Sequence, residues 1–417
     1  MRKNILRDKN FLLYFMGMFV TSIGNIFYSF AVSWYILKIT SSASQAGFYL
    51  AFSGVLSLVL SNFGAALVDR MDKVKIMYMT DYVRGVAIII AGLVIFNTES
   101  IQVILATLYA AAFVNSVFGS LFGPASSALV KYMVAEENLQ QANSYLQIKN
   151  SVQSILGMAL AGFIYTWFGP AWIFILNGIT FIMSGFTEMF IRVETQEEIE
   201  TKTTFKQILI DIKDGWAYVY SKKTIFRLML IAVFLNFPFA LMFGIGLPYL
   251  FNQTLNVAPS YLSWVEVVMS VSMIFMMVYL SRLEMNEKYY VNLRKYMILT
   301  TVFYLLSVAV VYTMDSSVLP FNISYGLFLF AMALMAVASA GLNVPMQTFF
   351  VKAFDKEMFA RAMVAIGIMS SVSYPLASVM GGLIIDNLGL SYLIGLSVSI
   401  YIFCLSWFLV DKKIKEI

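Results

Sequence analysis

Five ionisable side chains lie inside long apolar runs of this 417-residue sequence: Asp81, Arg84, Lys149, Glu188 and Glu266. Charged groups are costly inside a bilayer, so each is a candidate for gating or ion coupling. Asp81 and Arg84 are three residues apart, so they share a helix face and can pair, either structurally or as a gate. Lys149 and Glu266 lie deeper, and we expect them to pair across the two halves of the chain. Glu188 lies near the end of its run, where we expect it to reach water.

Three amides and an aromatic side chain form a second set of candidates. Asn25, Asn115 and Asn236 each fall near the middle of an apolar run. A buried amide can hydrogen-bond substrate, water or a neighbouring helix, so these residues are either cavity ligands or helix-packing contacts. Aromatic residues make up 16% of the chain. Together with Phe237, which follows Asn236, they favour a cavity for bulky apolar ligands.

Enzymatic chemistry has little support in the sequence. There is no histidine and the only cysteine is Cys404, so Ser-His and Cys-His nucleophiles and His-ligated metals are excluded. No Gly-x4-Gly-Lys-[Ser/Thr] motif is present for nucleotide binding. We therefore expect no catalytic residues, no metal site and no cofactor.

The candidate residues are positioned by runs long enough to cross a membrane. The chain is 60% hydrophobic and 12% charged, against about 25% charged residues in soluble proteins. About 20 apolar residues in a helix cross a bilayer, which predicts an all-α membrane protein of twelve transmembrane helices. The runs are 11–37, 44–68, 74–97, 102–123, 139–166, 169–191, 225–250, 259–281, 293–313, 320–348, 360–385 and 390–410.

The positive charges predict the orientation of the chain. With the N-terminus inside, all but three of the 28 Lys and Arg residues fall at the cytoplasmic side; the exceptions are Arg84, Lys149 and Lys38. This bias places both termini in the cytoplasm of a multi-pass inner-membrane protein. Because the charges follow topology, the net charge of +5 does not indicate nucleic-acid binding.

One long polar stretch divides the chain into two six-helix halves. We predict an N-terminal bundle over 1–191, a cytoplasmic linker with an amphipathic helix over 192–224, and a C-terminal bundle over 225–417. The halves repeat at an offset of 220 or 221 residues, which predicts two pseudo-symmetric bundles. The matched residues are Pro124 and Pro345, Lys131 and Lys352, Ala142 and Ala362, Ser151 and Ser371, Gly162 and Gly382, and Gly169 and Gly389.

Two blocks resemble a known family. The loop Asp69-Arg70-Met71-Asp72-Lys73 is similar to the signature of the major facilitator superfamily. Gly123-Pro124-Ala125, followed by Leu139 and Ala142-Asn143, looks like the macrolide-efflux branch of that family, as does Asp81 with Arg84. The resemblance implies that Asp69, Arg70 and Lys73 form a cytoplasmic gate.

The resemblance also implies a proton-linked exporter of amphiphilic small molecules, acting by alternating access. Its partners would be the small-molecule substrate, protons and the lipid bilayer, and we expect a monomer. Two alternatives stay open: a transporter of a specific metabolite or lipid, and a transport-inactive sensor or scaffold with the same fold.

Overall fold

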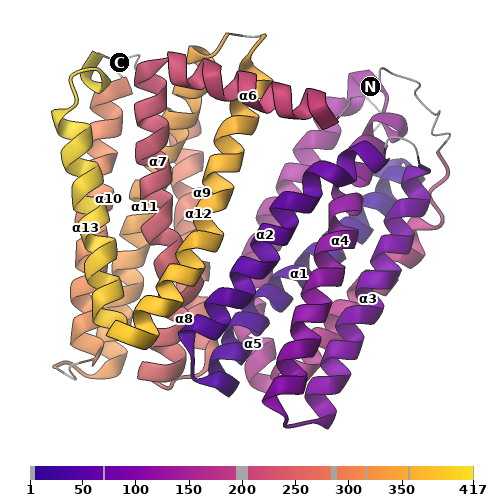
Figure 1. Cartoon of the computed structure of the whole chain (residues 1–417), viewed down its shortest axis with the longest axis horizontal. Coiled ribbons are helices and arrows are strands. Elements are labelled where there is room, and N and C mark those ends of the chain that lie inside the picture. The colour runs from indigo at the N-terminus through magenta and orange to yellow at the C-terminus, as the bar shows by residue number, and fades with distance from the viewer. Residues whose placement is uncertain are drawn as a thin grey trace. The chain divides into compact units, whose positions relative to one another are not determined.

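The computed structural model describes residues 5–68, 71–193, 205–282, 289–315, 318–355 and 357–416. The described residues form helices and no strands (Figure 1). The first half contains α1 (Lys9–Thr40), α2 (Ala43–Val68), α3 (Lys73–Asn97), α4 (Ile101–Met133) and α5 (Leu139–Glu188). The second contains α6 (Phe205–Ser221), α7 (Lys223–Leu241), α8 (Leu247–Tyr249), α9 (Pro259–Ser281), α10 (Tyr289–Asp315), α11 (Phe321–Ala353), α12 (Phe359–Leu388) and α13 (Leu390–Val410).

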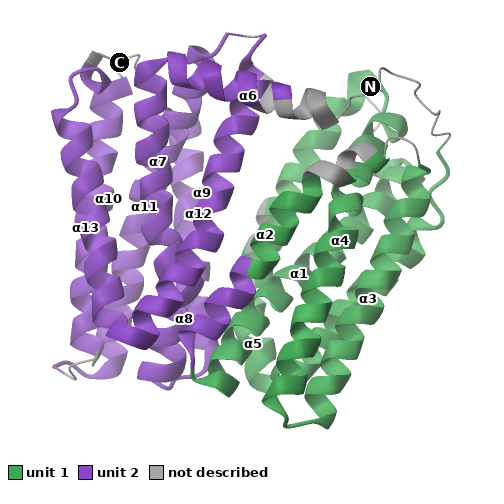
Figure 2. Ribbon diagram, in the orientation of Figure 1, with its two compact units in different colours: residues 1–41, 52–205 green, residues 42–51, 206–417 purple. Residues whose placement is uncertain are grey.

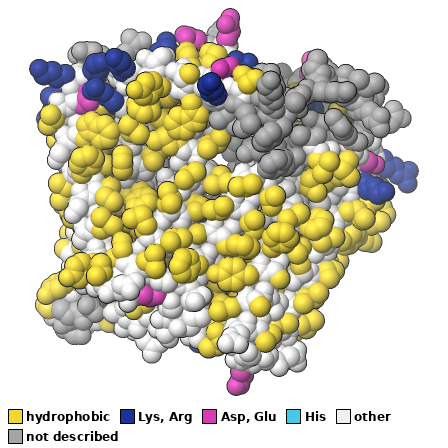
Figure 3. Space-filling view, viewed as in Figure 1, with side chains coloured by type: hydrophobic (Ala, Val, Ile, Leu, Met, Phe, Trp, Pro, Cys, Tyr) yellow, Lys and Arg dark blue, Asp and Glu magenta, His cyan; other side chains and the backbone are white. Residues whose placement is uncertain are grey.

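The predicted membrane spans are present. Among the described residues, 11 helices are long and apolar enough to cross a membrane. The remaining predicted span, 139–166, forms the first part of α5. Large apolar side chains such as Phe96 and Phe275 are exposed, and hydrophobic side chains are spread across the middle of the face drawn in Figure 3. Such a surface needs lipid around it.

Two glycines place sharp turns at matching positions of the two halves. Gly169, followed by Pro170, has φ 77° inside α5 and separates the fifth span from the sixth. Gly389 has φ 96° and separates α12 from α13. Both conformations strain an L-residue with a Cβ and suit glycine. Since this is one of the pairs in the predicted repeat, the structure confirms the repeat at this point.

Two prolines match in the same way, inside α4 and α11. Pro124 lacks the backbone N–H that would donate to the Ser120 carbonyl, four residues earlier, so this helical hydrogen bond is missing. Gly64 of α2 packs against that Ser120 carbonyl so closely that a Cβ at position 64 would overlap it. Pro345 holds the corresponding position in α11.

The chain divides into two compact units (Figure 2). Unit 1 consists of residues 1–41 and 52–205, and unit 2 consists of residues 42–51 and 206–417. The first turns of α2 are therefore grouped with unit 2, whereas the rest of the helix belongs to unit 1. The predicted linker 192–224 lies partly outside the described residues, so its boundaries stay a prediction.

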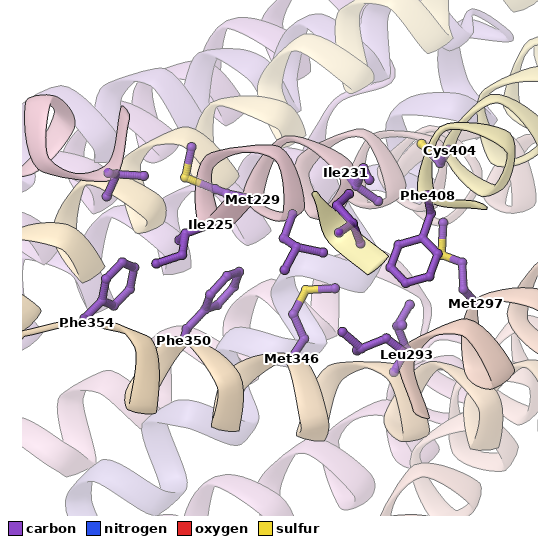
Figure 4. Packing of buried hydrophobic residues seen from close by; sticks show 14 of the residues in the cluster. Ile225, Met229, Ile231, Leu293, Met297, Met346, Phe350, Phe354, Cys404 and Phe408 are labelled. Atoms are coloured by element: carbon purple, nitrogen blue, oxygen red, sulfur yellow. The ribbon is translucent and has the colours of Figure 1, made fainter. Parts of the chain in front are cut away.

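Each unit has its own apolar core. In unit 1, Phe11, Met77 and Leu129 bring α1, α3 and α4 together. In unit 2, a larger cluster joins α7, α10, α11 and α13, with Met and Phe side chains interleaved (Figure 4). Its labelled members are Ile225, Met229, Ile231, Leu293, Met297, Met346, Phe350, Phe354, Cys404 and Phe408.

Helix α6 lies within the segment where the sequence predicts an amphipathic linker helix. Val219 is fully buried in the core of unit 2, and Trp216 packs against the same core. On the polar side, the Tyr218 hydroxyl donates to Asp355 at 2.8 Å and accepts from the Asp355 N–H at 2.9 Å. The helix is thus held to the segment between α11 and α12.

Candidate functional site

The predicted pair on α3 is present and buried. Arg84 Nη1 lies 3.4 Å from Asp81 Oδ1, and the two residues are 7% and 0% exposed. Arg84 Nε donates to Asn115 Oδ1 of α4 at 2.7 Å. The guanidinium lies over the rings of Phe181 and Phe122, at 4.1 and 5.5 Å from their centroids. Arg84 is therefore fixed by a carboxylate, an amide and two aromatic faces.

Glu188 joins this pair, contrary to the sequence expectation. We expected it to reach water, but it is 0% exposed. Its Oε1 accepts from the Ser184 hydroxyl at 3.1 Å, and Arg84 and Asp81 lie within electrostatic range. Helical side chains lean toward the N-terminus of their helix. Glu188 is the last residue of α5, so its side chain leans back into the unit instead of outward.

The second part of α5 has a polar face that the sequence analysis did not predict. Asn177, Thr180, Ser184 and Glu188 recur at helical spacing, and that spacing was the signal that could have revealed the face. The face packs on α1 at glycines: a Cβ at Gly17 would lie 3.0 Å from the oxygens of Ser184 and Thr187. Small residues let helices approach closely enough for such contacts in membranes.

The three asparagines are not equivalent. Asn115 accepts a hydrogen bond from Arg84, so its side chain links α4 to α3. Asn25 is half-buried on α1. Asn236 lines a cavity of about 210 Å³ within unit 2, together with Asn343, Ser339 and Thr300. This cavity offers amide and hydroxyl groups alongside methionine and alanine side chains.

Phe237 does not share a cavity with Asn236. It lines a larger cavity of about 720 Å³ between α7, α12, α13 and the end of α6. Adjacent residues point about 100° apart around a helix, which explains the separation. Trp216, Phe234 and Phe403 form the aromatic part of the lining, and its side-chain polar groups are the hydroxyls of Ser373 and Ser399 and the Trp216 indole N–H.

A sequence profile decides the family. The profile of the Major Facilitator Superfamily matches residues 14–283 and 229–416, essentially the whole chain. The chain belongs to the Major Facilitator Superfamily. The expected fold class and the resemblance are thereby confirmed, and the chain is a multi-pass membrane transporter by family.

Several transport proteins of known sequence are similar to the chain over about half of its length or more. The uncharacterized MFS-type transporter YvqJ of Bacillus subtilis is 23% identical over 90% of this chain and 85% of its own. Macrolide efflux protein A of Streptococcus pyogenes is 23% identical over 90% of this chain and 89% of its own. The putative bacilysin exporter BacE of Bacillus subtilis is 26% identical over about half of each chain.

Solved structures of two other transporters share the fold. A bacterial homologue of the iron transporter ferroportin in an inward-facing state has a TM-score of 0.76, at 16% identity, over 97% of this chain and 98% of that one. The nucleoside transporter NupG has a TM-score of 0.70, at 13% identity, over 97% and 100%. These likenesses concern the fold alone. In the described part of this chain, no three His, Cys, Asp or Glu side chains lie together as a metal site would need.

The superfamily signature loop is only partly described. Asp69 and Arg70 lie outside the described residues, so their gate role stays a prediction. Lys73 is 4% exposed at the start of α3, with Nζ 5.4 Å from the centroid of the Tyr132 ring. Asp72 caps α3 by accepting from Val74 N at 2.9 Å and Lys75 N at 3.1 Å.

The predicted charge pair spans the two units. Lys149 is buried on α5 of unit 1, and Glu266 is half-buried on α9 of unit 2. The positions of the units relative to one another are not determined, so the pairing stays a prediction.

A carboxylate that the sequence analysis did not single out caps α2. Asp386 of α12 accepts from the Ser42 hydroxyl at 2.6 Å, Ala43 N at 2.8 Å and Ser44 N at 2.9 Å. All four residues belong to unit 2. Carboxylates are favoured at helix N-termini, where N–H groups lack intrahelical partners.

Proposed function

We propose that this transporter exports hydrophobic or amphiphilic small molecules, driven by the proton gradient through alternating access. The observation that carries the proposal is the cavity around Phe237. Its volume of about 720 Å³ suits a drug-sized molecule, and its aromatic lining with few hydroxyls suits an apolar one. Similarity to macrolide and bacilysin exporters supports the direction of transport.

The test is accumulation of erythromycin and ethidium in cells with and without the chain, repeated with a protonophore. We expect lower accumulation with the chain, and no difference once the proton gradient is dissipated. Phe237→Ala combined with Phe403→Ala should restore accumulation. Phe275→Ala is the matched control, because Phe275 is an exposed aromatic residue on α9. Equal accumulation with and without the chain for both compounds would contradict the proposal.

The cavity around Asn236 favours a second candidate, transport of a specific metabolite or lipid with hydrogen-bonding groups. Two amide-bearing and three hydroxyl-bearing side chains line it, in a volume of about 210 Å³. In a competition assay, a nucleoside or amino-acid mixture would then displace a bound substrate and ethidium would not. A chain that moves neither class would be a sensor or scaffold.

A further inference from the structure

The buried cluster of unit 1 has more negative than positive groups. Asp81 and Glu188 carry two carboxyls, and Arg84 carries one guanidinium, which stays protonated in proteins. With both carboxyls ionised, the cluster has a net charge of −1 where α1, α3, α4 and α5 meet. A net charge of this kind is costly in a low-dielectric interior.

Hydrogen bonding does not compensate this charge. Asp81 Oδ2 and Glu188 Oε2 are both inaccessible to solvent, and neither has a hydrogen-bond partner. Arg84 uses Nη1 on Asp81 and Nε on Asn115, while aromatic rings cover its guanidinium. Glu188 keeps the Ser184 hydroxyl. A buried carboxylate held by a single hydroxyl is poorly satisfied, whereas a carboxylic acid supplies its own donor.

The side chains named below surround the cluster, and none of them takes up a proton in place of Asp81 or Glu188. Tyr14 of α1 lies within electrostatic range of Glu188. The Tyr14 hydroxyl lies 2.9 Å from Ser126 Oγ of α4. From α4, Asn115 and Phe122 face Arg84 and do not titrate. The Ser184 hydroxyl lies beside both carboxyls and links α5 to α3.

We propose that Asp81 and Glu188 form a proton-binding site that holds one proton, with Arg84 as its fixed counter-charge. This rests on the proposed proton-driven export and identifies where the coupling proton binds. A proton from water adds to one carboxylate, which becomes a carboxylic acid, and the cluster passes from −1 to neutral. Releasing the same proton to water restores the charge. No covalent bond other than O–H forms or breaks.

Infrared spectroscopy of the purified full-length protein tests the site without transport. Stepping the pH should change the C=O stretch of a buried carboxylic acid in the wild type. Asp81→Asn and Glu188→Gln should each abolish this band, because the remaining carboxylate then pairs one to one with Arg84. Glu188→Asp should retain it. Glu266→Gln, a half-buried carboxyl of the other unit, is the control and should leave this band unchanged.

The band identifies the site even if one variant folds poorly, since Asp81→Asn and Glu188→Gln make the same prediction independently. Infrared spectra are recorded only for variants that elute as a single symmetric peak in size-exclusion chromatography. Persistence of the band in a folded variant of either kind would overturn the proposal.

Transport by proteoliposomes separates this inference from the proposed function. With radiolabelled erythromycin, Glu188→Gln should lose accumulation driven by a pH gradient and keep counterflow exchange. Gradient-driven accumulation that survives in this variant overturns the proton site and leaves the proposed function standing. A wild type that ignores the gradient contradicts the proposed function, and the infrared band then decides the proton site alone.

Discussion

Arg84 joins several buried groups in the interior of unit 1. It is the cation of a buried cluster and reaches α4 through Asn115. Removing one partner of a buried charged hydrogen bond costs more than the bond contributes, because the other partner stays desolvated. The asparagines therefore differ in what their loss should do, although all three looked alike in the sequence.

We expect Asn115→Leu to lower the free energy of unfolding by about 2 kcal/mol, since Arg84 Nε loses its acceptor. Asn236→Leu should change substrate preference with little effect on stability, because Asn236 lines an open cavity. Thermal unfolding in detergent and substrate competition measure the two effects. Equal destabilisation by both changes would place Asn236 in helix packing instead.

Only some of the contacts of these residues could be predicted from the sequence. The pairing of Asp81 with Arg84 follows from a spacing of three on one helix, so local geometry was enough. The burial of Glu188 depends on Tyr14, Asp81 and Arg84, which come from two other helices. No local pattern encodes those contacts. Asn236 and Phe237 were grouped because they are neighbours in sequence, although helix geometry separates them.

At the scale of elements, the linker helix α6 is part of unit 2 by packing and by charge. The Tyr218 hydroxyl and Lys222 lower the pKa of Asp355 from its ordinary value, so Asp355 stays ionised at neutral pH. Lys222 Nζ lies 3.5 Å from Asp355 Oδ2. A lowered carboxyl pKa means that the contact is fully present above the unfolded value and is lost as the pH falls through the folded value.

Tyr218→Phe should loosen this anchor, because one hydroxyl both donates to Asp355 and accepts from its N–H. Amide exchange over residues 218–222 and at Asp355 should become faster, as measured by mass spectrometry. Tyr220→Phe is the matched control, since Tyr220 is exposed on the same helix. In the wild type, the protection of these amides against exchange should stay constant from about pH 8 to pH 5, because this range lies above ordinary carboxyl pKa values. Unchanged exchange in Tyr218→Phe would show that apolar packing alone holds α6.

Most of the helices could be predicted because each span carries its own hydropathy signal. The division between α12 and α13 also follows from sequence, since Gly389 repeats Gly169 in the matched position. The cap on α2 could not be predicted. Asp386 lies more than 300 residues from Ser42, and nothing near either residue indicates the contact.

For the whole molecule, topology gives a direct test. We expect a tag after Ile417 and a tag inserted at 195–204 to report from the cytoplasm. Cysteines introduced at Thr98 or Asn256 should react with an impermeant reagent from outside. The reason is the bias of Lys and Arg toward one side of the predicted spans. Labelling of Asn256 from the cytoplasmic side alone would require a different number of crossings before it.

The predicted pair of Lys149 and Glu266 has one residue in each unit. Either charge reversal alone should abolish transport, because it places like charges together. Lys149→Glu combined with Glu266→Lys should recover it, as the pair is restored with opposite polarity. Counterflow of erythromycin is the measurement. A double variant as inactive as the single ones would assign the two residues to separate roles.

Residues 42–51 are grouped with unit 2, and this affects how the protein could be expressed as two separate fragments. A cut in the linker would yield two polypeptides, and the second would lack the start of α2. Asp386 would lose the three donors that the structure gives it, and the backbone around Ser378 would lose Gly47, which packs directly on its carbonyl. A split protein should therefore assemble only when the first fragment supplies this short segment, which makes α2 the natural place to look for dominant-negative fragments.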